Sequence, residues 1–408
     1  MKLKRPEIIA PVGDFVMLRA AIDAKCDAVY FGTEELNMRV RAGSFKISEL
    51  KKVVKLCHEN NVKAYLTLNT IVYDNETKNV KKIIAASKKA GIDAIICWDM
   101  SVVNEALRQK MNVNLSTQAS VSNFEAVKYY ANLGIKKIVL ARECTLTQIR
   151  EIIKKIKKEK LDVKIETFVH GAMCVSVSGR CFISQFMHCK SANRGECLQP
   201  CRHEYDIIDR ETGEMLTVDN HYVMSPKDLC AIRFVDKLIE AGIDSFKIEG
   251  RVKPPEYVKT VVSAYREAVD AYFEKRFTKE FAEALEERLK TVFNRGFSDG
   301  FFMGEPINEF TDSYGGKATV KKDFLGVIKN YYSKINVAEL KIESNSLKVG
   351  DKIMIQGPTT GVVEEIINSI QINHRDVDKV IKGKSAAVKL ANKVRLNDKV
   401  FLIKERKQ

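Results

Sequence analysis

The sequence predicts an α/β protein: a (β/α)8 barrel of the TIM type with a cysteine-rich insertion, followed by a small antiparallel β-barrel domain. Eight short, nearly all-apolar segments alternate with amphipathic segments of helical period, as parallel strands buried on both faces would do. A count of eight favours a closed barrel over an open sheet. The alternative, a doubly wound sheet, lacks support because no G-x-G-x-x-G fingerprint follows the first strand.

The strand–helix units begin at residue 7 and occupy a predicted first domain, residues 1–310. Asp14 is suited to cap the first helix and Gly91 to end the third, because aspartate accepts from free N–H groups and glycine adopts left-handed backbone. The predicted strands are 7–13, 28–32, 62–70, 93–99, 113–118, 136–143, 163–171 and 244–250, and the predicted helices are 14–26, 47–61, 76–91, 101–111, 123–134, 145–160, 229–242 and 254–273.

Polar residues end six of the eight predicted strands. In barrels of this type, binding and catalytic groups lie at the C-terminal ends of the strands. Any one of these residues could simply cap a helix, but the repetition indicates a polar pocket for a small charged molecule. The residues are Asn69, Asp99, Ser116, Gln118, Arg142, Glu143, Glu166, His170, Lys247, Glu249 and Arg251.

Cysteines concentrate in the insertion, which the pattern places at residues 172–228 and which also contains a predicted hairpin at 204–224. Four thiolates suit either a tetrahedral zinc ion or an iron–sulfur cluster. Only Cys197 and Cys201 have the spacing of a zinc knuckle, so the irregular spacing of the others favours iron–sulfur. The cysteines here are Cys174, Cys181, Cys189, Cys197 and Cys201, and Cys230 follows near the start of a predicted helix.

A catalytic cysteine is the competing interpretation of this stretch. Cys174 lies four residues after His170, and the two would resemble a thiol–imidazole pair. Such a pair would leave the other cysteines of the insertion unexplained. The cysteines outside the cluster are interpreted as small core residues: Cys26, Cys57, Cys97 and Cys144.

The composition bears on compartment and partners. The chain has no run of about 18 apolar residues and no signal-peptide pattern, so we expect a cytoplasmic protein with no membrane partner. A reducing compartment disfavours disulfides and leaves metal binding or thiol chemistry for the clustered cysteines. The formal net charge of +15 favours a polyanion such as RNA, with a lysine-rich surface as the alternative.

The pattern changes to strands alone after a small-residue segment at 312–318. Period-two alternation with glycine- and asparagine-containing turns predicts a small antiparallel barrel over residues 317–408. This part contains 19 Lys/Arg and 10 Asp/Glu, a net charge of +9. This positive charge could simply belong to a solvent-exposed surface, but we favour the interpretation that the domain binds RNA.

Several motifs together resemble peptidase family U32, the collagenase-like peptidases. They are ETFVHGAMCVSVSGRCFIS, ANRGECLQPCR and SPKDLC around the cysteines, with APVGD, AVYFG, STQAS and LARE in the barrel pattern. The resemblance covers nearly the whole chain. It implies either proteolysis or the activity of similar RNA hydroxylation proteins, which work without molecular oxygen.

The hydroxylation branch implies a 4Fe–4S cluster and prephenate-dependent formation of 5-hydroxyuridine at the tRNA wobble position; another branch modifies a cytidine of ribosomal RNA. Matched by motif, the cluster ligands are Cys174, Cys181, Cys197 and Cys230. Cys201 is then the spare and the alternative fourth ligand, while Cys189 has no assigned role. RNA, with tRNA foremost, and a paralogous protein are the partners that the resemblance implies.

Roles for the remaining residues follow from their positions at strand ends. Five cations are predicted to bind the carboxylates of a prephenate-like cosubstrate: Arg39, Arg41, Arg142, Lys247 and Arg251. Glu166 and His170 are predicted to act as acid/base or orienting groups. A collagenase-like peptidase is the alternative function, although neither H-E-x-x-H nor G-x-S-x-G occurs. A non-catalytic RNA-binding or cluster-carrying protein is the second alternative.

Overall fold

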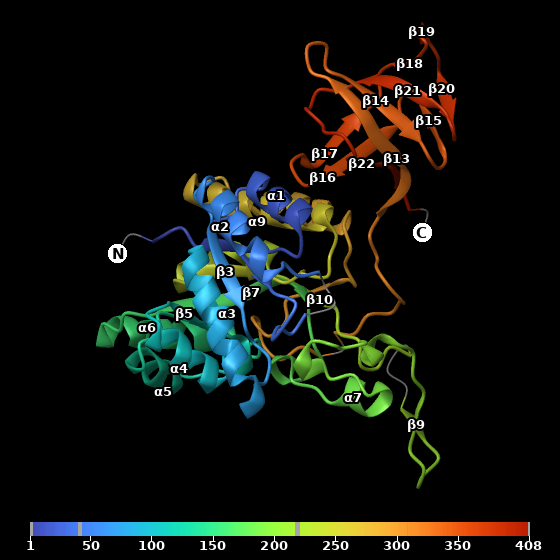
Figure 1. Ribbon diagram of the computed structural model, residues 1–408. Coiled ribbons are helices and arrows are strands. Elements are labelled where there is room, and N and C mark those ends of the chain that lie inside the picture. The colour runs from blue at the N-terminus through green and yellow to red at the C-terminus, as the bar shows by residue number, and fades with distance from the viewer. Residues whose placement is uncertain (1–2, 40–42, 217–220, 308, 407–408) are drawn as a thin grey trace.

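Eight parallel strands close into a barrel in the computed structural model, which describes residues 3–39, 43–216, 221–307 and 309–406 (Figure 1). Each strand pairs with its neighbour from β1 to β7, and β11 pairs with both β7 and β1 to close the ring. The predicted barrel is therefore confirmed. Its strands are β1 (Glu7–Pro11), β2 (Ala28–Gly32), β3 (Lys63–Thr67), β4 (Ala94–Cys97), β5 (Val113–Leu115), β6 (Lys137–Val139), β7 (Lys164–Ala172) and β11 (Ser245–Ile248).

Helices pack around the outside of this barrel (Figure 1). The predicted caps are confirmed: the Asp14 carboxylate accepts from the Met17 amide at 2.7 Å, and Gly91 ends α3 with a φ of 86°. The helices are α1 (Phe15–Asp23), α2 (Leu50–His58), α3 (Thr77–Ala90), α4 (Met100–Arg108), α5 (Phe124–Asn132), α6 (Leu146–Glu159), α8 (Val235–Ala241), α9 (Pro255–Phe273) and α10 (Lys279–Lys290).

Strand residues alternate between two buried environments. In β1, Ile8 and Ala10 belong to the large core between strands and helices, whereas Ile9 belongs to a small cluster that includes Tyr30 and Tyr65. This alternation explains why the strands are apolar on both faces. The barrel interior is thus filled by side chains, as in other barrels of this type.

The predicted helix at 229–242 is wrong at its start. Asp228–Cys230 forms strand β10, which pairs antiparallel with β7 and parallel with β12 (Phe297–Ser298), and α8 begins only at Val235. The nine-residue β7 extends far enough to pair with this segment. A short apolar run buried beside a sheet has no periodicity that separates strand from helix.

The insertion lies between β7 and β10. It contains helix α7 (Ile183–His188), several 3-10 turns and a hairpin of β8 (Ile207–Ile208) and β9 (Met215–Leu216), which projects from the body at the lower right of Figure 1. The hairpin predicted at 204–224 is present, although residues 217–220 of that range lie outside the described residues.

The C-terminal part forms an antiparallel sheet, as predicted, in the order β17-β16-β22-β13-β14-β21-β18-β19, with β15 and β20 as a separate pair. It has its own hydrophobic core. The strands are β13 (Val320–Tyr332), β14 (Val337–Ile342), β15 (Ser346–Lys348), β16 (Lys352–Gly357), β17 (Gly361–Ile366), β18 (Ile370–Ile372), β19 (Arg375–Asp376), β20 (Lys379–Ile381), β21 (Ser385–Lys389) and β22 (Lys399–Glu405).

This sheet packs on the barrel through β16 and β17, next to α1 and α9 (Figure 1). Met354 and Val362 form a small apolar cluster with Ala20 of α1. Lys259 of α9 donates to the Val362 carbonyl at 2.6 Å, and the Lys322 ammonium lies 2.8 Å from the Glu256 carboxylate. The interface therefore combines apolar and polar contacts. Within the described part of the chain, no helix is long and apolar enough to span a membrane.

Candidate active site

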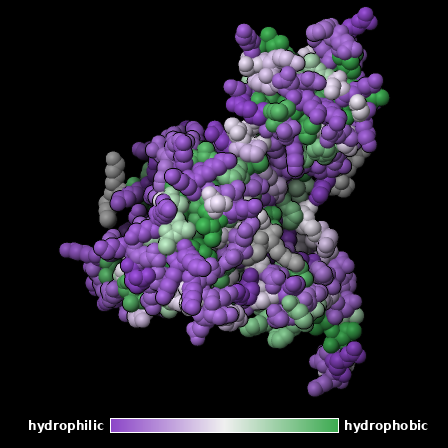
Figure 2. Space-filling view, in the orientation of Figure 1, coloured by the Kyte–Doolittle hydropathy of each residue, from purple (hydrophilic) through white to green (hydrophobic). Residues whose placement is uncertain are grey.

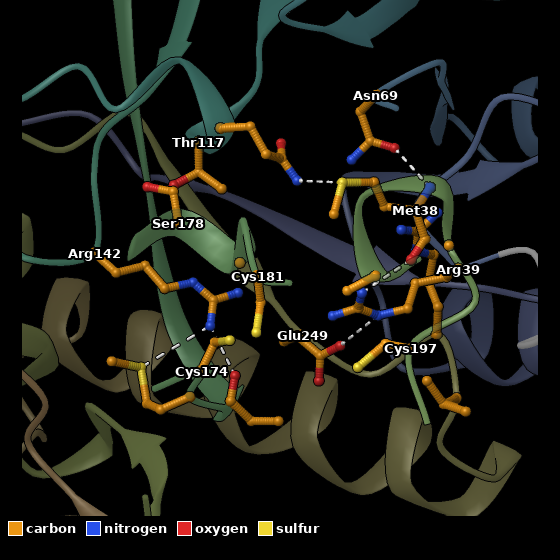
Figure 3. Close-up of a pocket in the computed structure, with 18 of the residues that line it drawn as sticks. Met38, Arg39, Asn69, Thr117, Arg142, Cys174, Ser178, Cys181, Cys197 and Glu249 are labelled. Atoms are coloured by element: carbon orange, nitrogen blue, oxygen red, sulfur yellow. Dashed lines mark hydrogen bonds and ion pairs between the residues drawn. The ribbon is translucent and has the colours of Figure 1, made fainter. Parts of the chain in front are cut away.

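A pocket opens at the C-terminal ends of the barrel strands, beneath the insertion (Figure 3). Thr67 at the end of β3, Phe168 in β7 and Lys247 in β11 contribute from the barrel, while residues 172–202 contribute the opposite wall. The location agrees with the rule that barrel enzymes place their chemistry at this end. The predicted pocket at the polar strand ends is thus present.

Four cysteines line this pocket: Cys174, Cys181, Cys197 and Cys201. Figure 3 shows Cys174, Cys181 and Cys197 on the walls around the same space, with Glu249 between them. The Cys181 and Cys197 sulfurs each accept a backbone N–H at 3.4 Å, from Ile183 and Gln199 respectively. Such N–H···S contacts stabilise thiolates, which are the metal-binding form of cysteine.

The structure does not bring Cys230 to this pocket. Cys230 is 4% exposed within the barrel core, where β10 pairs it with His170, and burial raises the pKa of its thiol to about 12. Burial also raises the pKa of the Cys201 thiol, whereas the positive charge of Arg202 lowers it. The neighbouring thiols raise this pKa as well: Cys174, Cys197 and Cys181. Cys201 therefore lies within electrostatic reach of the other three thiols.

The arrangement of the thiols distinguishes between the two metal centres, zinc and iron–sulfur, that suit four cysteines. In the described ranges, no three His, Cys, Asp or Glu side chains converge closely enough to hold a single metal ion. A zinc ion needs all its ligands at one centre, whereas the thiolates of a 4Fe–4S cluster each bind a different iron atom and lie farther apart. Four thiols around one cavity fit the cluster better. Cys189, exposed at the end of α7, is outside this lining.

Cations form another wall of the pocket. Arg39, Arg142, Lys247 and Arg251 all line it, whereas Arg41 lies outside the described residues. The Arg142 guanidinium lies 4.0 Å from the centre of the Phe168 ring and donates to the Ala172 carbonyl at 2.7 Å. These contacts leave the planar guanidinium facing the cavity beside Cys174 (Figure 3).

Two polar side chains hold Arg251 in place. Its guanidinium donates to the Asn37 side-chain oxygen and to the Thr67 hydroxyl, each at 2.9 Å. Burial lowers the Arg251 pKa to about 10, so the group remains positively charged at neutral pH. Arg251 is therefore a fixed positive charge at the pocket floor, oriented by neutral partners that leave its charge available.

Glu249 is the acidic residue within this cationic wall. Burial would raise its pKa, but Arg39, Lys253, Arg142 and Arg251 together lower it below the ordinary value. Its carboxylate lies 3.9 Å from the Arg39 guanidinium. Glu249 was recognised from sequence only as a polar strand end; its position makes it the residue that separates the cations from one another.

Glu166 lies beneath the pocket and does not line it. It is 1% exposed, with its carboxylate 2.7 Å from the Lys247 ammonium and 3.7 Å from the Lys137 ammonium. Lys137 in turn lies 2.5 Å from the Glu7 carboxylate, which also pairs with Lys63. The buried charges thus form a continuous ionic chain through the barrel. This placement favours the orienting role predicted for Glu166 over the acid/base one.

His170 faces away from the pocket. The pairing of β7 with β11 shifts register so that Phe168 and His170 oppose consecutive residues, which marks a bulge at Val169. Because the bulge reverses the alternation, Phe168 lines the pocket and His170 packs against Tyr257 and Tyr265 of α9. Burial lowers the His170 pKa to about 3, so the imidazole is neutral. Direct acid/base contact with a pocket ligand is not compatible with this position.

Arg202 is a site residue that the sequence interpretation left without a role. Its guanidinium donates to the Met173 carbonyl at 2.5 Å and to the Pro226 carbonyl at 2.7 Å. It thereby ties both ends of the insertion together next to Cys174. Its place directly after Cys201 in the Q-P-C-R motif was the available signal.

The fold and the pocket define a class: a parallel (β/α) barrel whose mouth is lined by four cysteines and several cations. The family model for peptidase family U32 matches residues 13–312. The chain belongs to peptidase family U32.

Relatives in this family carry different functional names. The chain is 42% identical to a collagenase of Porphyromonas gingivalis over 98% of this chain and 99% of the relative. It is 36% identical to tRNA hydroxylation protein P1 of Bacillus subtilis, over 87% of this chain and 84% of the relative. It is 35% identical to the 23S rRNA 5-hydroxycytidine C2501 synthase of Escherichia coli, over 75% of this chain and 48% of the relative. Family membership therefore supports an enzyme, either a hydroxylase or a peptidase.

The ionic chain predicts a measurable effect on Lys247. Burial lowers the pKa of Lys247 and the Glu166 carboxylate raises it, so Glu166→Gln should lower that pKa further. The variant should lose the Lys247 charge at a lower pH than the wild type. NMR titration of nitrogen-labelled lysines, assigned with Lys247→Met, measures this. Glu286→Gln is the matched control, because Glu286 is also nearly buried and pairs with Arg233 outside the pocket. If Lys247 titrates at the same pH in Glu166→Gln as in the wild type, the proposed ionic coupling between Glu166 and Lys247 is contradicted.

Proposed function

We propose that this protein hydroxylates a base in RNA without molecular oxygen, in the cytoplasm. The proposed substrate is the wobble uridine of tRNA and the proposed product is 5-hydroxyuridine. One observation carries the proposal: four thiols and a wall of cations share a single pocket at the catalytic end of the barrel. The names of the B. subtilis and E. coli relatives, both RNA hydroxylation proteins, support it.

The four pocket cysteines, Cys174, Cys181, Cys197 and Cys201, are the proposed ligands of a 4Fe–4S cluster. A cluster of this type would supply one-electron redox chemistry at the pocket. The backbone N–H groups of Ile183 and Gln199 would tune the potential through their contacts with two ligand sulfurs. This set differs from the motif-based one in its fourth member, Cys201 in place of Cys230.

The cationic wall is proposed to bind a prephenate-like cosubstrate. Converting a C–H bond of the base to C–OH adds one oxygen atom and removes two electrons, so a reaction without dioxygen needs another source of the oxygen atom and an acceptor for the two electrons. Arg142 and Arg251 present planar donor groups, which suit carboxylates in a bidentate geometry. Lys247 adds a point charge, and the Glu249 carboxylate offsets part of the positive charge of this wall.

Proteolysis is the second candidate, favoured by the name of the P. gingivalis relative. A thiol peptidase would need a base beside Cys174. His170 is enclosed behind the pocket wall, and in the described ranges no histidine lines the pocket. The geometry therefore supports the hydroxylase better than a thiol–imidazole peptidase.

The two candidate fourth ligands can be separated by iron analysis. We expect Cys201→Ser to lose most of the iron and the visible charge-transfer absorption of the anaerobically reconstituted protein, because its sulfur lines the pocket. Cys230→Ala should keep the iron. Its free energy of unfolding should be about 1–3 kcal/mol lower than that of the wild type, as expected when a small buried side chain is shortened. The opposite pattern, with iron lost only in Cys230→Ala, would reinstate the motif-based ligand set.

The activity is tested by nucleoside analysis of tRNA from a strain that lacks the protein. We expect 5-hydroxyuridine and its derivatives to disappear by mass spectrometry and to return with the wild-type gene. Arg142→Gln should restore about one tenth or less, since a charge-assisted contact is worth roughly 1.5–3 kcal/mol. Arg150→Gln, on the outer helix α6, should restore the wild-type amount. Unchanged nucleosides in the deletion strain, with cleavage of gelatin by the purified protein, would favour the peptidase.

A further inference from the structure

Helix α7 of the insertion has an inverted pattern of burial. Ser184 is 1% exposed, whereas Phe182 is 61% and Phe186 is 83% exposed. Four residues apart, the two phenylalanines lie on one face, with ring centres separated by 6.0 Å. A helix normally buries its aromatic side chains and exposes serine. The aromatic face of α7 is therefore directed to solvent.

The orientation of α7 is fixed by polar contacts. The Ser184 hydroxyl accepts the Leu198 amide at 3.1 Å, which joins the helix to the turn that carries Cys197. The Tyr205 hydroxyl lies 4.0 Å from the Met187 sulfur and donates to the Pro200 carbonyl at 2.9 Å. The phenylalanines are thus held outward by the same contacts that position the cysteine turn.

Phe182 and Phe186 belong to the segment of the insertion that also contributes residues to the pocket lining. Phe182 lies between Cys181 and Ile183, both of which line the pocket. Tyr73, in the loop after β3, is 57% exposed, and the Arg194 guanidinium of the insertion lies 5.2 Å from its ring centre. We call Tyr73, Phe182 and Phe186 the aromatic rim.

Charge divides the insertion into two halves. Residues 176–203 contain Arg180, Lys190, Arg194 and Arg202 against one acidic residue, Glu196. The hairpin segment 204–216 contains five acidic residues and only Arg210 as a cation. Figure 2 shows apolar colouring on part of the hairpin and hydrophilic colouring at its tip. A polyanion would be attracted to the α7 half and repelled by the hairpin.

From these observations we propose that the aromatic rim is a stacking platform for the unpaired nucleotides that flank the target base in RNA. Exposed rings interleaved with arginine and lysine are the features by which proteins hold single-stranded nucleic acid. The exposed Arg180 is the cation placed to meet a phosphate, because Arg194 is paired with Glu76. The rings stack on bases irrespective of their sequence. The proposal rests on the proposed RNA hydroxylation and names the surface that would present the substrate to the pocket.

The test compares RNA binding by full-length, cluster-loaded variants. Phe186→Ala should bind a labelled oligouridine about 5- to 150-fold more weakly than wild type, because loss of one stacked base costs roughly 1–3 kcal/mol. Its affinity for an RNA duplex of the same length should change little. Phe186→Tyr should keep most of the affinity, since the ring remains. Tyr129→Ala, which removes a 61% exposed ring from the outer helix α5, is the matched control and should bind as wild type.

Wild-type iron content and thermal stability in Phe186→Ala establish that the insertion is intact. Equal oligouridine affinity in wild type and Phe186→Ala overturns the platform, while the hydroxylase proposal is decided separately by the tRNA nucleosides. A change of sedimentation in Phe186→Ala, with unaltered RNA affinity, would assign the rim to a protein partner and overturn the platform too.

Discussion

The structure depends on how charges are paired inside a barrel that excludes water. An isolated ion in such an interior is strongly unfavourable, and it persists only with partners of opposite charge or several hydrogen bonds. Glu7, Lys137, Glu166 and Lys247 satisfy this requirement as an alternating chain. This series of ion pairs ends with Lys247 at the pocket floor. One of the pocket cations, Lys247, is therefore held in place by charges inside the barrel.

Two sets of contacts hold the insertion next to the pocket floor. Strand β7 extends to Ala172 and pairs with β10, so both ends of the insertion start from the same piece of sheet. Arg202 then joins Met173 to Pro226 across the base of the insertion. Because Cys174 directly follows Met173, its thiol is held at a fixed place beside Arg142 and near Glu249 (Figure 3). The thiols and the cations are thereby brought to one cavity.

Sequence alone predicted the barrel because strands buried on both faces leave an unmistakable apolar pattern, and Asp14 and Gly91 mark helix ends by local chemistry. It also predicted that Arg39, Arg142, Lys247 and Arg251 would share a pocket. It could not place the His170 side chain relative to the pocket, because a bulge at Val169 reverses the alternation of β7 and single-residue bulges have no distinct sequence pattern. It predicted a helix where Cys230 lies in strand β10, because a short apolar segment is compatible with either strand or helix.

The central claim is that the thiol wall and the cationic wall act together on RNA. The most direct measurement is a reaction of the anaerobically reconstituted wild-type protein with unmodified tRNA and prephenate, with dioxygen excluded, followed by nucleoside mass spectrometry. The account predicts 5-hydroxyuridine at the wobble position that requires both the reconstituted iron and prephenate. A protein that carries no iron after reconstitution, or that carries iron and leaves the tRNA unchanged with prephenate present, would contradict it.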